Sequence, residues 1–408
     1  MLGGLGVGAG VTVTTLLAFE LSGTAALAGV AASASAFGAG VFAAVIGAMS
    51  PFGRRPGLVG GYLVGLLGAG TAVVSAVLGS FPLMVAATFL FGASNASNLQ
   101  ARYAATDLAS ADRKGSDLSI VVWATTVGAV LGPNLTGPGV AAAQLIGVPD
   151  LAGPYLLSAG GFASAALVLL LGLRPDPLLL ARGLREVRPG PEGADAAPVR
   201  PRGAIATGLA AVSADPSARA AVASIASAQA VMVGVMVMTP VHMGHHGADV
   251  RIIGLTISLH ILGMYALSPV FGRLVDRLGA RPVLGLGFVQ LLAAVALSAT
   301  STPQGGAGFF AGLLLLGTGW SAALIASSAL LTTGIPLDAR APAQGLSDLA
   351  MNVAGGSAGA LSGLVMTLLG FRLMALATVV LLLAPALMVL ADSGRHRRAT
   401  AMSAAPTS

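Results

Sequence analysis

Long apolar stretches recur from one end of the chain to the other, separated by shorter segments that hold most of the charged residues. Many approach or exceed the ~20 residues that a helix needs to cross a bilayer, so the pattern predicts membrane-spanning helices and not barrel strands. The first begins at Met1 without a basic preamble or a cleavage site, which favours a retained span over a signal peptide. Twelve spans are predicted, at residues 2–21, 24–48, 58–79, 82–104, 118–140, 152–173, 219–242, 250–270, 282–300, 307–334, 347–369 and 371–391.

The composition agrees with a polytopic, all-α membrane protein. Of the 408 residues 55% are hydrophobic and only 9% are charged, and the mean hydropathy is +0.88. A soluble globular domain carries roughly 25% charged residues. The chain has no cysteine, which excludes a disulfide framework and thiolate metal ligands.

The net charge of +6 raises the question of nucleic-acid binding, and the positions of the basic residues answer it. With the N-terminus placed in the cytoplasm, all of the 21 Lys and Arg residues except Arg251 and Arg372 fall on the inner side. This asymmetry follows the positive-inside rule, so both termini are expected in the cytoplasm. The charge therefore indicates membrane topology, and we expect the lipid bilayer and no nucleic acid as a partner.

The chain is predicted to divide into two six-span halves. Residues 174–218 interrupt the apolar pattern with Arg, Pro and Gly and are expected to form a cytoplasmic linker, with an amphipathic helix at 178–188. The predicted units are 1–173, 174–218, 219–391 and a cytoplasmic tail at 392–408. The two halves also resemble each other, because "GRRP" at 53–56 and "GARP" at 279–282 occupy the same place between the second and third spans of their half.

The second copy, "GRLVDRLGARP" from Gly272 to Pro282, resembles the signature loop of the major facilitator superfamily. The first copy departs from this signature, because Ser50 stands where the second has Asp276. The resemblance implies the major facilitator fold and a loop that pairs with helix ends at a cytoplasmic gate. The gate residues that it implies are Gly272, Asp276, Arg277, Gly279 and Arg281.

No motif of an enzyme or of an ATP-driven pump occurs in the sequence. Among ionisable residues in the spans, Glu20 and Asp348 are candidates for coupling, because such groups are costly in lipid. Both lie close to a predicted membrane interface, which favours solvated helix ends. In span four Asn95, Asn98 and Arg102 share helical spacing, so they face the transport cavity or tie helices together.

Span five contains "GAVLGPNLTGPG", from Gly128 to Gly139. It resembles the Gly-Pro motif of drug/proton antiporters, although the spacing after Pro133 is longer by one residue and a second proline intervenes. Gly and Pro would also bend this helix and permit close packing in a protein with another function. The motif keeps proton-coupled drug efflux open as an alternative.

Sulfur and imidazole side chains are concentrated in one part of the second half. Met232 and Met236 are four residues apart in span seven, and His260 and Met264 are four apart in span eight, so each pair shares a helix face. Thioether and imidazole donors suit soft Cu(I). Methionine is also an ordinary filler of helix contacts, and a histidine in a span can simply bond a neighbouring helix. A second group, expected at the outer mouth for metal capture or as ordinary hydrated residues, comprises His242, Met243, His245 and His246.

The pairing of Met-x-x-x-Met in span seven with His-x-x-x-Met in span eight resembles the CcoA-like copper importers of bacterial inner membranes, a family within the major facilitator superfamily. The resemblance implies import of copper as substrate along Met232, Met236, His260 and Met264, with no resident cofactor. It also implies the bacterial cytoplasmic membrane as the location, and the sequence identifies no cytoplasmic copper chaperone. Because the wider family includes proposed riboflavin transporters, a riboflavin-type importer is an alternative. A non-transporting sensor that uses residues 174–218 is a third hypothesis.

Overall fold

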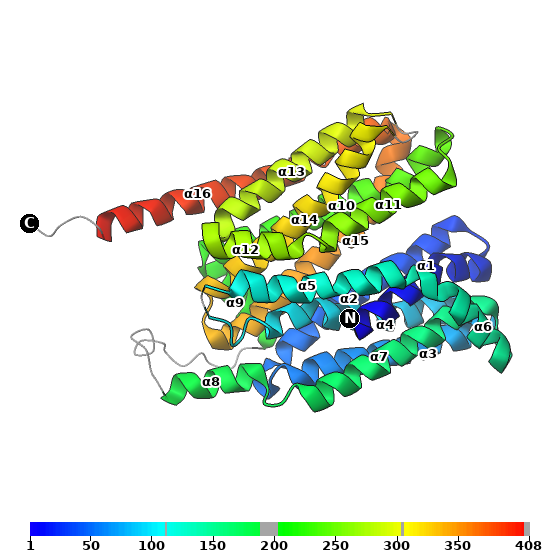
Figure 1. The fold of residues 1–408 in the computed structure, drawn as a ribbon, viewed down its shortest axis with the longest axis horizontal. Coiled ribbons are helices and arrows are strands. Elements are labelled where there is room, and N and C mark those ends of the chain that lie inside the picture. Colours follow the sequence, from blue (N-terminus) through cyan, green and yellow to red (C-terminus); the bar gives the residue numbers. More distant parts are fainter. Residues whose placement is uncertain (111, 188–202, 303–305, 404–408) are drawn as a thin grey trace, which may run out of the picture.

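The computed structural model describes residues 1–110, 112–187, 203–302 and 306–403, and within these residues the chain is helical without a strand (Figure 1). The predicted all-α class is confirmed. The helices before the linker region are α1 (Leu2–Ser22), α2 (Ala25–Ala48), α3 (Arg55–Leu78), α4 (Phe81–Ala104), α5 (Lys114–Leu131), α6 (Thr136–Ile146) and α7 (Gly153–Gly172), with short 3-10 helices η1 (Ser50–Phe52), η2 (Pro133–Leu135) and η3 (Asp150–Ala152).

The remaining helices form the linker region and the second half. The predicted amphipathic helix is present as α8, although it begins one residue earlier than expected. The bounds are α8 (Pro177–Val187), α9 (Ala204–Ala214), α10 (Pro216–His245), α11 (Val250–Tyr265), α12 (Ser268–Leu278), α13 (Ala280–Thr300), α14 (Ala307–Gly334), α15 (Leu337–Ala377) and α16 (Val380–Ser403).

Each of the twelve predicted spans falls on a helix or on a broken pair of helices. Among the described residues, nine segments are long and apolar enough to cross a membrane. One of them, Leu337–Ala391, contains two predicted spans, because the chain turns at Gly370 with φ 74°. The helix α4 and the pair α5 and α6 are not among the nine; α4 carries Asn, Gln and Arg, and the pair is interrupted.

Three predicted spans are not continuous helices, and the last of them, 371–391, is interrupted at residues 378–379 between α15 and α16. Span five stops at Leu131, passes through η2 at Pro133 and resumes as α6, because proline cannot donate the next helical hydrogen bond. Span eight stops at Tyr265 and resumes at Ser268 as α12. The signature segment expected to be a loop from Gly272 is therefore helical as far as Leu278, and this corrects the prediction. The expected tail after residue 391 is also helical, because α16 continues to Ser403.

Glycine brings α5 directly against α1. A Cβ atom placed on Gly128 would collide with the backbone of Gly4, and one on Gly132 would collide with Gly8. Both pairs have the four-residue spacing that allows two helices to approach closely. Close helix packing therefore accounts for Gly128 and Gly132 of the span-five motif without an antiport function.

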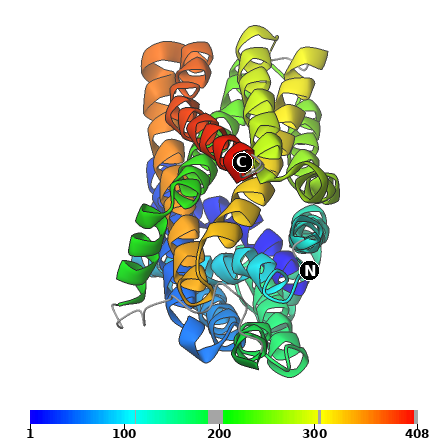
Figure 2. The same ribbon diagram turned by 90° about the vertical axis from the view of Figure 1, so that its left-hand side faces the viewer.

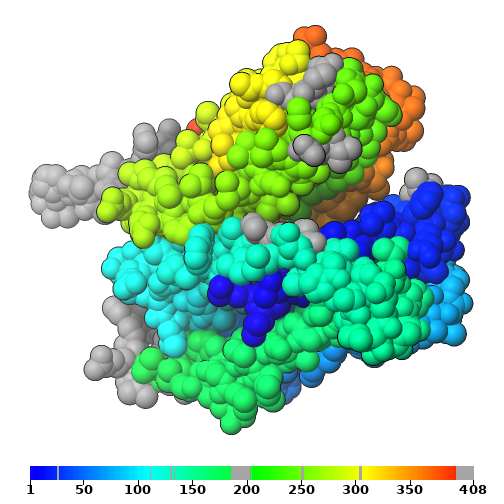
Figure 3. All heavy atoms as spheres, turned by 45° about the vertical axis from the view of Figure 1, so that its right-hand side comes forward, coloured from blue at the N-terminus to red at the C-terminus, as the bar shows by residue number. Residues whose placement is uncertain are grey.

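The two halves meet at one end of the molecule and diverge at the other (Figure 1). At the shared end α5 packs on α12 and α2 packs on α15. The view from the linker end places the second half above the first (Figure 2), and the packed atoms show the two lobes in contact on the α12 side (Figure 3). The positive-inside rule predicts that the linker end is cytoplasmic. In that orientation the halves are closed on the inner side and separated toward the outside.

Candidate transport site

A central cavity of about 920 Å³ lies between the two halves. Its walls come from α1 and α2 on one side and from α10 and α15 on the other. The lining is mostly Ala, Gly and Val, and it includes no charged side chain among the described residues. Its few polar groups include Ser33 of α2, Gln229 of α10 and Asn352 of α15. A space of this size and character suits an organic solute.

Two amide side chains of the cavity are held by the second half itself. The Trp320 Nε1–H donates to Gln229 Oε1 at 2.5 Å, and the Trp320 ring lies edge-on to Tyr265 with centroids 5.9 Å apart. The Asn352 Nδ2–H donates to the backbone oxygen of Asp348 at 2.8 Å. Each amide is thereby fixed on a rigid helix.

Beneath Asn352, a buried ion pair joins the two halves. Arg102 Nη2 of α4 lies 2.5 Å from Asp348 Oδ1 of α15, with side chains 1% and 0% exposed. The same guanidinium also donates to the Tyr103 hydroxyl, Ser328 Oγ and the Leu99 carbonyl. The prediction of a solvated helix end for Asp348 is wrong, because α4 of the opposite half covers this side chain. A pair in such surroundings interacts far more strongly than one in water.

A second buried cluster joins the halves through Arg54, the first arginine of "GRRP". Its guanidinium donates to both carboxylate oxygens of Asp107, at 2.7 and 3.0 Å, and to Gln344 Oε1 of α15 at 2.6 Å. Asp107 and Gln344 were not predicted as functional. The duplicated sequence pattern marked Arg54, but nothing along the chain indicated its partners, which lie 53 and 290 residues away.

The signature segment forms a further contact between the halves at the same end of the molecule, where α12 packs on α5. The carboxylate of Asp276 accepts hydrogen bonds from the backbone N–H of Gly115 at 2.7 Å and of Ser116 at 2.9 Å. These N–H groups lie in the first turn of α5 and have no acceptor within the helix. The helix dipole also favours a negative charge at this position. Gly272 of α12 approaches the Gly115 backbone too closely for any side chain.

The other predicted gate residues make different contributions. Gly279 adopts φ 88°, a conformation that favours glycine, and so allows the turn between α12 and α13. The Arg281 Nη2–H donates to Ser217 Oγ at 3.1 Å within the second half. Arg277 is exposed on the last turn of α12.

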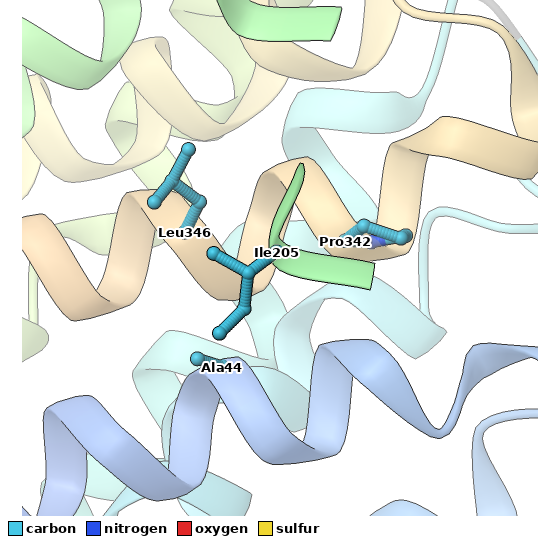
Figure 4. A pocket seen from close by; sticks show the side chains of 4 residues that line it. All are labelled: Ala44, Ile205, Pro342 and Leu346. Carbon is cyan, nitrogen blue, oxygen red and sulfur yellow. The ribbon is translucent and has the colours of Figure 1, made fainter. Parts of the chain in front are cut away.

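The linker region contributes a helix that the sequence analysis did not predict. The apolar α9 packs on α15 and touches α2, so it lies over the junction of the halves. Figure 4 shows Ala44, Ile205, Pro342 and Leu346 around the recess between these helices, which leaves no space for a water molecule. This recess is a packing contact and not a ligand site.

The four residues of the predicted copper path lie inside the second half and are not among the residues that line the cavity. Met232, His260 and Met264 are 6%, 2% and 9% exposed, and Met236 is half-buried. α10 and α11 both pack against α14 and make few contacts with each other. His260 Nδ1 lies 3.0 Å from the Leu313 carbonyl, whereas its Nε2 is buried without a hydrogen-bond partner in the described structure.

The predicted outer group comes together only in part: the His242 and His246 rings are in contact, with centroids 4.4 Å apart, whereas Met243 and His245 lie apart from them. Met243 is fully buried in the core, and the His242 ring stacks on Phe371 at 4.1 Å. His246 Nδ1 lies 2.8 Å from the His242 carbonyl, and His245 is exposed. In the part of the chain that the structure describes, no three His, Cys, Asp or Glu side chains are grouped as a metal site.

The remaining polar candidates are separate from the cavity wall. Glu20 is exposed near the outer end of α1, as expected for a solvated helix end. Asn95 is half-buried on α4. Asn98 Oδ1 accepts from the Tyr62 hydroxyl at 3.4 Å and so ties α4 to α3.

Comparison with known proteins agrees with this architecture. The sequence model of the Major Facilitator Superfamily matches residues 1–248 and 220–407. The chain is 38% identical over 385 residues to the uncharacterized MFS-type transporter YddS of Bacillus subtilis, covering 93% of this chain and 85% of that protein. It is 30% identical over 304 residues to the riboflavin transporter RfnT of Brucella anthropi, covering 74% of this chain and 70% of that protein.

Among solved structures, the human organic anion transporter MFSD10 superposes with a TM-score of 0.72 at 16% sequence identity, covering 95% of this chain and 98% of that one. At this identity the likeness concerns the fold alone. The fold has two lobes around a central cavity, and the family model matches nearly the whole sequence. The chain therefore belongs to the Major Facilitator Superfamily and is a membrane transporter, not an enzyme.

Proposed function

We propose that this transporter moves an uncharged, largely planar organic solute, of the size and class of riboflavin, through the central cavity by alternating access. The observation that carries the proposal is the cavity itself, which has a volume of about 920 Å³ and apolar walls with a few fixed amide groups. Ligand pockets of about 300–1,000 Å³ with this mixture of groups hold molecules of drug size.

The character of the walls also argues against a charged substrate or a bare ion in this cavity. A charged group taken out of water needs an opposite charge or several hydrogen bonds to offset its desolvation. Among the described residues that line the cavity, the side-chain heteroatoms belong to hydroxyl and amide groups and to the single thioether of Met238, and none carries a charge. The 30% identity to a riboflavin transporter adds support from the sequence for an uncharged, ring-containing solute.

Transport of riboflavin by cells that cannot synthesise it tests the proposal. Ala360 lines the cavity, so Ala360→Trp should fill the space and reduce riboflavin flux at least tenfold. The control is Leu67→Trp, because Leu67 is 61% exposed on the outer surface of α3 and its replacement leaves the cavity unchanged. Equal flux in wild type, both variants and cells without the protein would contradict the proposal.

A second candidate function is copper import, which one observation favours. In neutral His260 the Nδ1 next to the Leu313 carbonyl must carry the proton, because a carbonyl can only accept. The buried Nε2 is then unprotonated, and its lone pair has no hydrogen-bond partner in the described structure. Met264 lies one helical turn away. A metal-binding histidine commonly has this arrangement, in which the other ring nitrogen donates to a carbonyl.

Cellular uptake of radioactive copper separates this candidate from the first. The exchange Met264→Leu preserves apolar volume but removes the thioether, so copper import would fall several-fold and riboflavin flux would not. Met366→Leu is the matched control, because Met366 packs against the same apolar core but is not part of the predicted path. Unchanged copper uptake in both Met264→Leu and His260→Ala would exclude copper import along these residues.

A further inference from the structure

The two amides of the cavity lie on the neighbouring helices α10 and α15, and Gln229 packs one turn of α15 away from Asn352. Gly355 follows Asn352 by three residues on α15, and a Cβ placed on it would lie 2.8 Å from Gln229 Cγ and 3.1 Å from Gln229 Nε2. Residues three apart on a helix have neighbouring side chains, about 5–6 Å apart. The side chains of Gln229 and Asn352 are therefore neighbours on the second-half wall of the cavity.

The protein contacts of each amide fix which of its atoms remains for a ligand. An indole N–H can only donate, so Gln229 must turn its oxygen to Trp320 and leave its NH2 group unused. A backbone carbonyl can only accept, so Asn352 must turn its NH2 group to Asp348 and leave its oxygen unused. The wall thus offers the NH2 group of Gln229 as a donor beside the Oδ1 of Asn352 as an acceptor.

We propose that Gln229 and Asn352 together recognise the edge of a planar ring in which a carbonyl stands next to an N–H, as in a lactam or a cyclic imide. The ligand carbonyl accepts from Gln229 Nε2, and the ligand N–H donates to Asn352 Oδ1. This inference rests on the proposed function, because it specifies the chemistry of the solute that enters the same cavity.

Because Asn352 lies at the inner end of the cavity, a ligand would enter with its amide edge leading. Asn352 lies at the inner end of the cavity, where a Cβ on Gly40 of α2 would be 3.3 Å from Asn352 Cβ. One turn further in, Asp348 forms the buried ion pair that joins the halves. A ring bound edge-on to the two amides therefore rests on the cytoplasmic gate, with its remaining surface along the Ala, Gly and Val walls.

Pairing of this kind discriminates strongly, because a buried donor or acceptor left without a partner is costly. A ligand with an N-methyl group in place of N–H cannot donate to Asn352 Oδ1 and also brings a methyl group against it. A charged amine or carboxylate would satisfy one of the two positions and leave the other unpaired.

Riboflavin and its N3-methyl derivative provide the test, because the N3–H of riboflavin stands between two ring carbonyls. Binding of each to the purified full-length protein is measured by quenching of flavin fluorescence. In the wild type we expect N3-methylation to weaken binding at least tenfold. In Asn352→Leu the two compounds should bind within twofold of each other, and in Gln229→Met riboflavin should bind at least tenfold more weakly than in wild type.

The control is Asn98→Leu, which removes an amide outside the cavity wall and should preserve the full discrimination. Retained binding of the N3-methyl compound by Asn352→Leu also shows that this variant is folded. Equal binding of both compounds by the wild type would overturn amide-edge recognition and leave the proposed function standing. If neither compound binds and riboflavin flux is absent, both the recognition and the proposed function fail.

Discussion

The two ends of the molecule differ in how the halves meet. At the cytoplasmic end the contact is made by buried charges, Arg102 with Asp348 and Arg54 with Asp107 and Gln344. Toward the outside the halves enclose a cavity with apolar walls and no charged lining residue. Charged hydrogen bonds are strong and directional, so they define one closed state, whereas an apolar wall accepts solutes without holding the halves together. We therefore expect the gate to set the conformation and the cavity to select the solute.

The largest effect is expected when one charge of the gate is removed. Arg102→Leu leaves Asp348 buried without its cationic partner, and breaking such a pair costs about 3–5 kcal/mol. We expect a much lower thermal midpoint in detergent and loss of transport. In the double variant Arg102→Leu/Asp348→Leu no buried charge is left, so stability should largely return without normal transport. Arg113→Leu is the control, because Arg113 is 68% exposed; a single Arg102 variant as stable as wild type would contradict the prediction.

A smaller effect is expected from Gln344→Leu. Arg54 and Asp107 both belong to the first half, so Gln344 supplies the contact from Arg54 to the second half. Loss of a hydrogen bond to a charged group is worth about 1.5–3 kcal/mol, which shifts the equilibrium toward the inward-open state roughly tenfold or more.

The absence of native cysteine makes this shift measurable. A single cysteine introduced at Ala360, in the cavity, should react more slowly with a membrane-impermeant maleimide added outside when Gln344→Leu is present. Gln290→Leu on α13 is the matched control, because it removes the same amide elsewhere in the second half. Equal labelling rates in all three proteins would argue against a gate role for Gln344.

Asp276→Asn should have a more modest effect on the same labelling rate. The neutral amide loses the favourable interaction of a negative charge with the start of α5, worth about 0.3–1 kcal/mol. One oxygen can still accept from Gly115 N–H, but the NH2 group cannot accept from Ser116 N–H. We expect a two- to fivefold shift toward the inward-open state. Asp276→Ala should shift it further, and the opposite order would contradict the helix-terminus explanation.

The smallest effect is expected where α8 touches the second half. Arg182 Nε lies 3.2 Å from Asp338 Oδ1, but the Asp338 side chain is 81% exposed. Solvent screens such a pair, so Asp338→Asn should change the free energy of unfolding by less than about 0.5 kcal/mol and leave transport near the wild-type rate. A slowing of maleimide labelling at Ala360→Cys as large as that caused by Gln344→Leu would show that the linker belongs to the gate.

The local pattern predicted some of these features and missed others for identifiable reasons. "GRLVDRLGARP" predicted a gate segment, and Asp276 indeed lies at a contact between the halves. The motif could not reveal that the segment is largely helical or that its partner is the start of α5. Asp348 was misjudged because depth along one helix does not tell which helices surround its end.

For the Met and His pairs too, the local pattern did not reveal what surrounds the side chains. Four-residue spacing placed each pair on one helix face, but the faces turn toward the interior of the second half, where α14 lies between. Gln229 and Asn352 carry no motif and were not singled out. Their hydrogen bonds to Trp320, 91 residues from Gln229, and to the Asp348 backbone reveal which of their atoms remain for a ligand.

The sequence by itself determined the all-helical class, the spans and the superfamily, because these depend on apolar length and on a contiguous motif. The distribution of basic residues predicts which side is the inner one. The tertiary structure decided which charges close the gate, where the cavity lies and which atoms face it. Those properties arise from side chains up to 290 residues apart, brought together by the packing of two halves that no local pattern encodes.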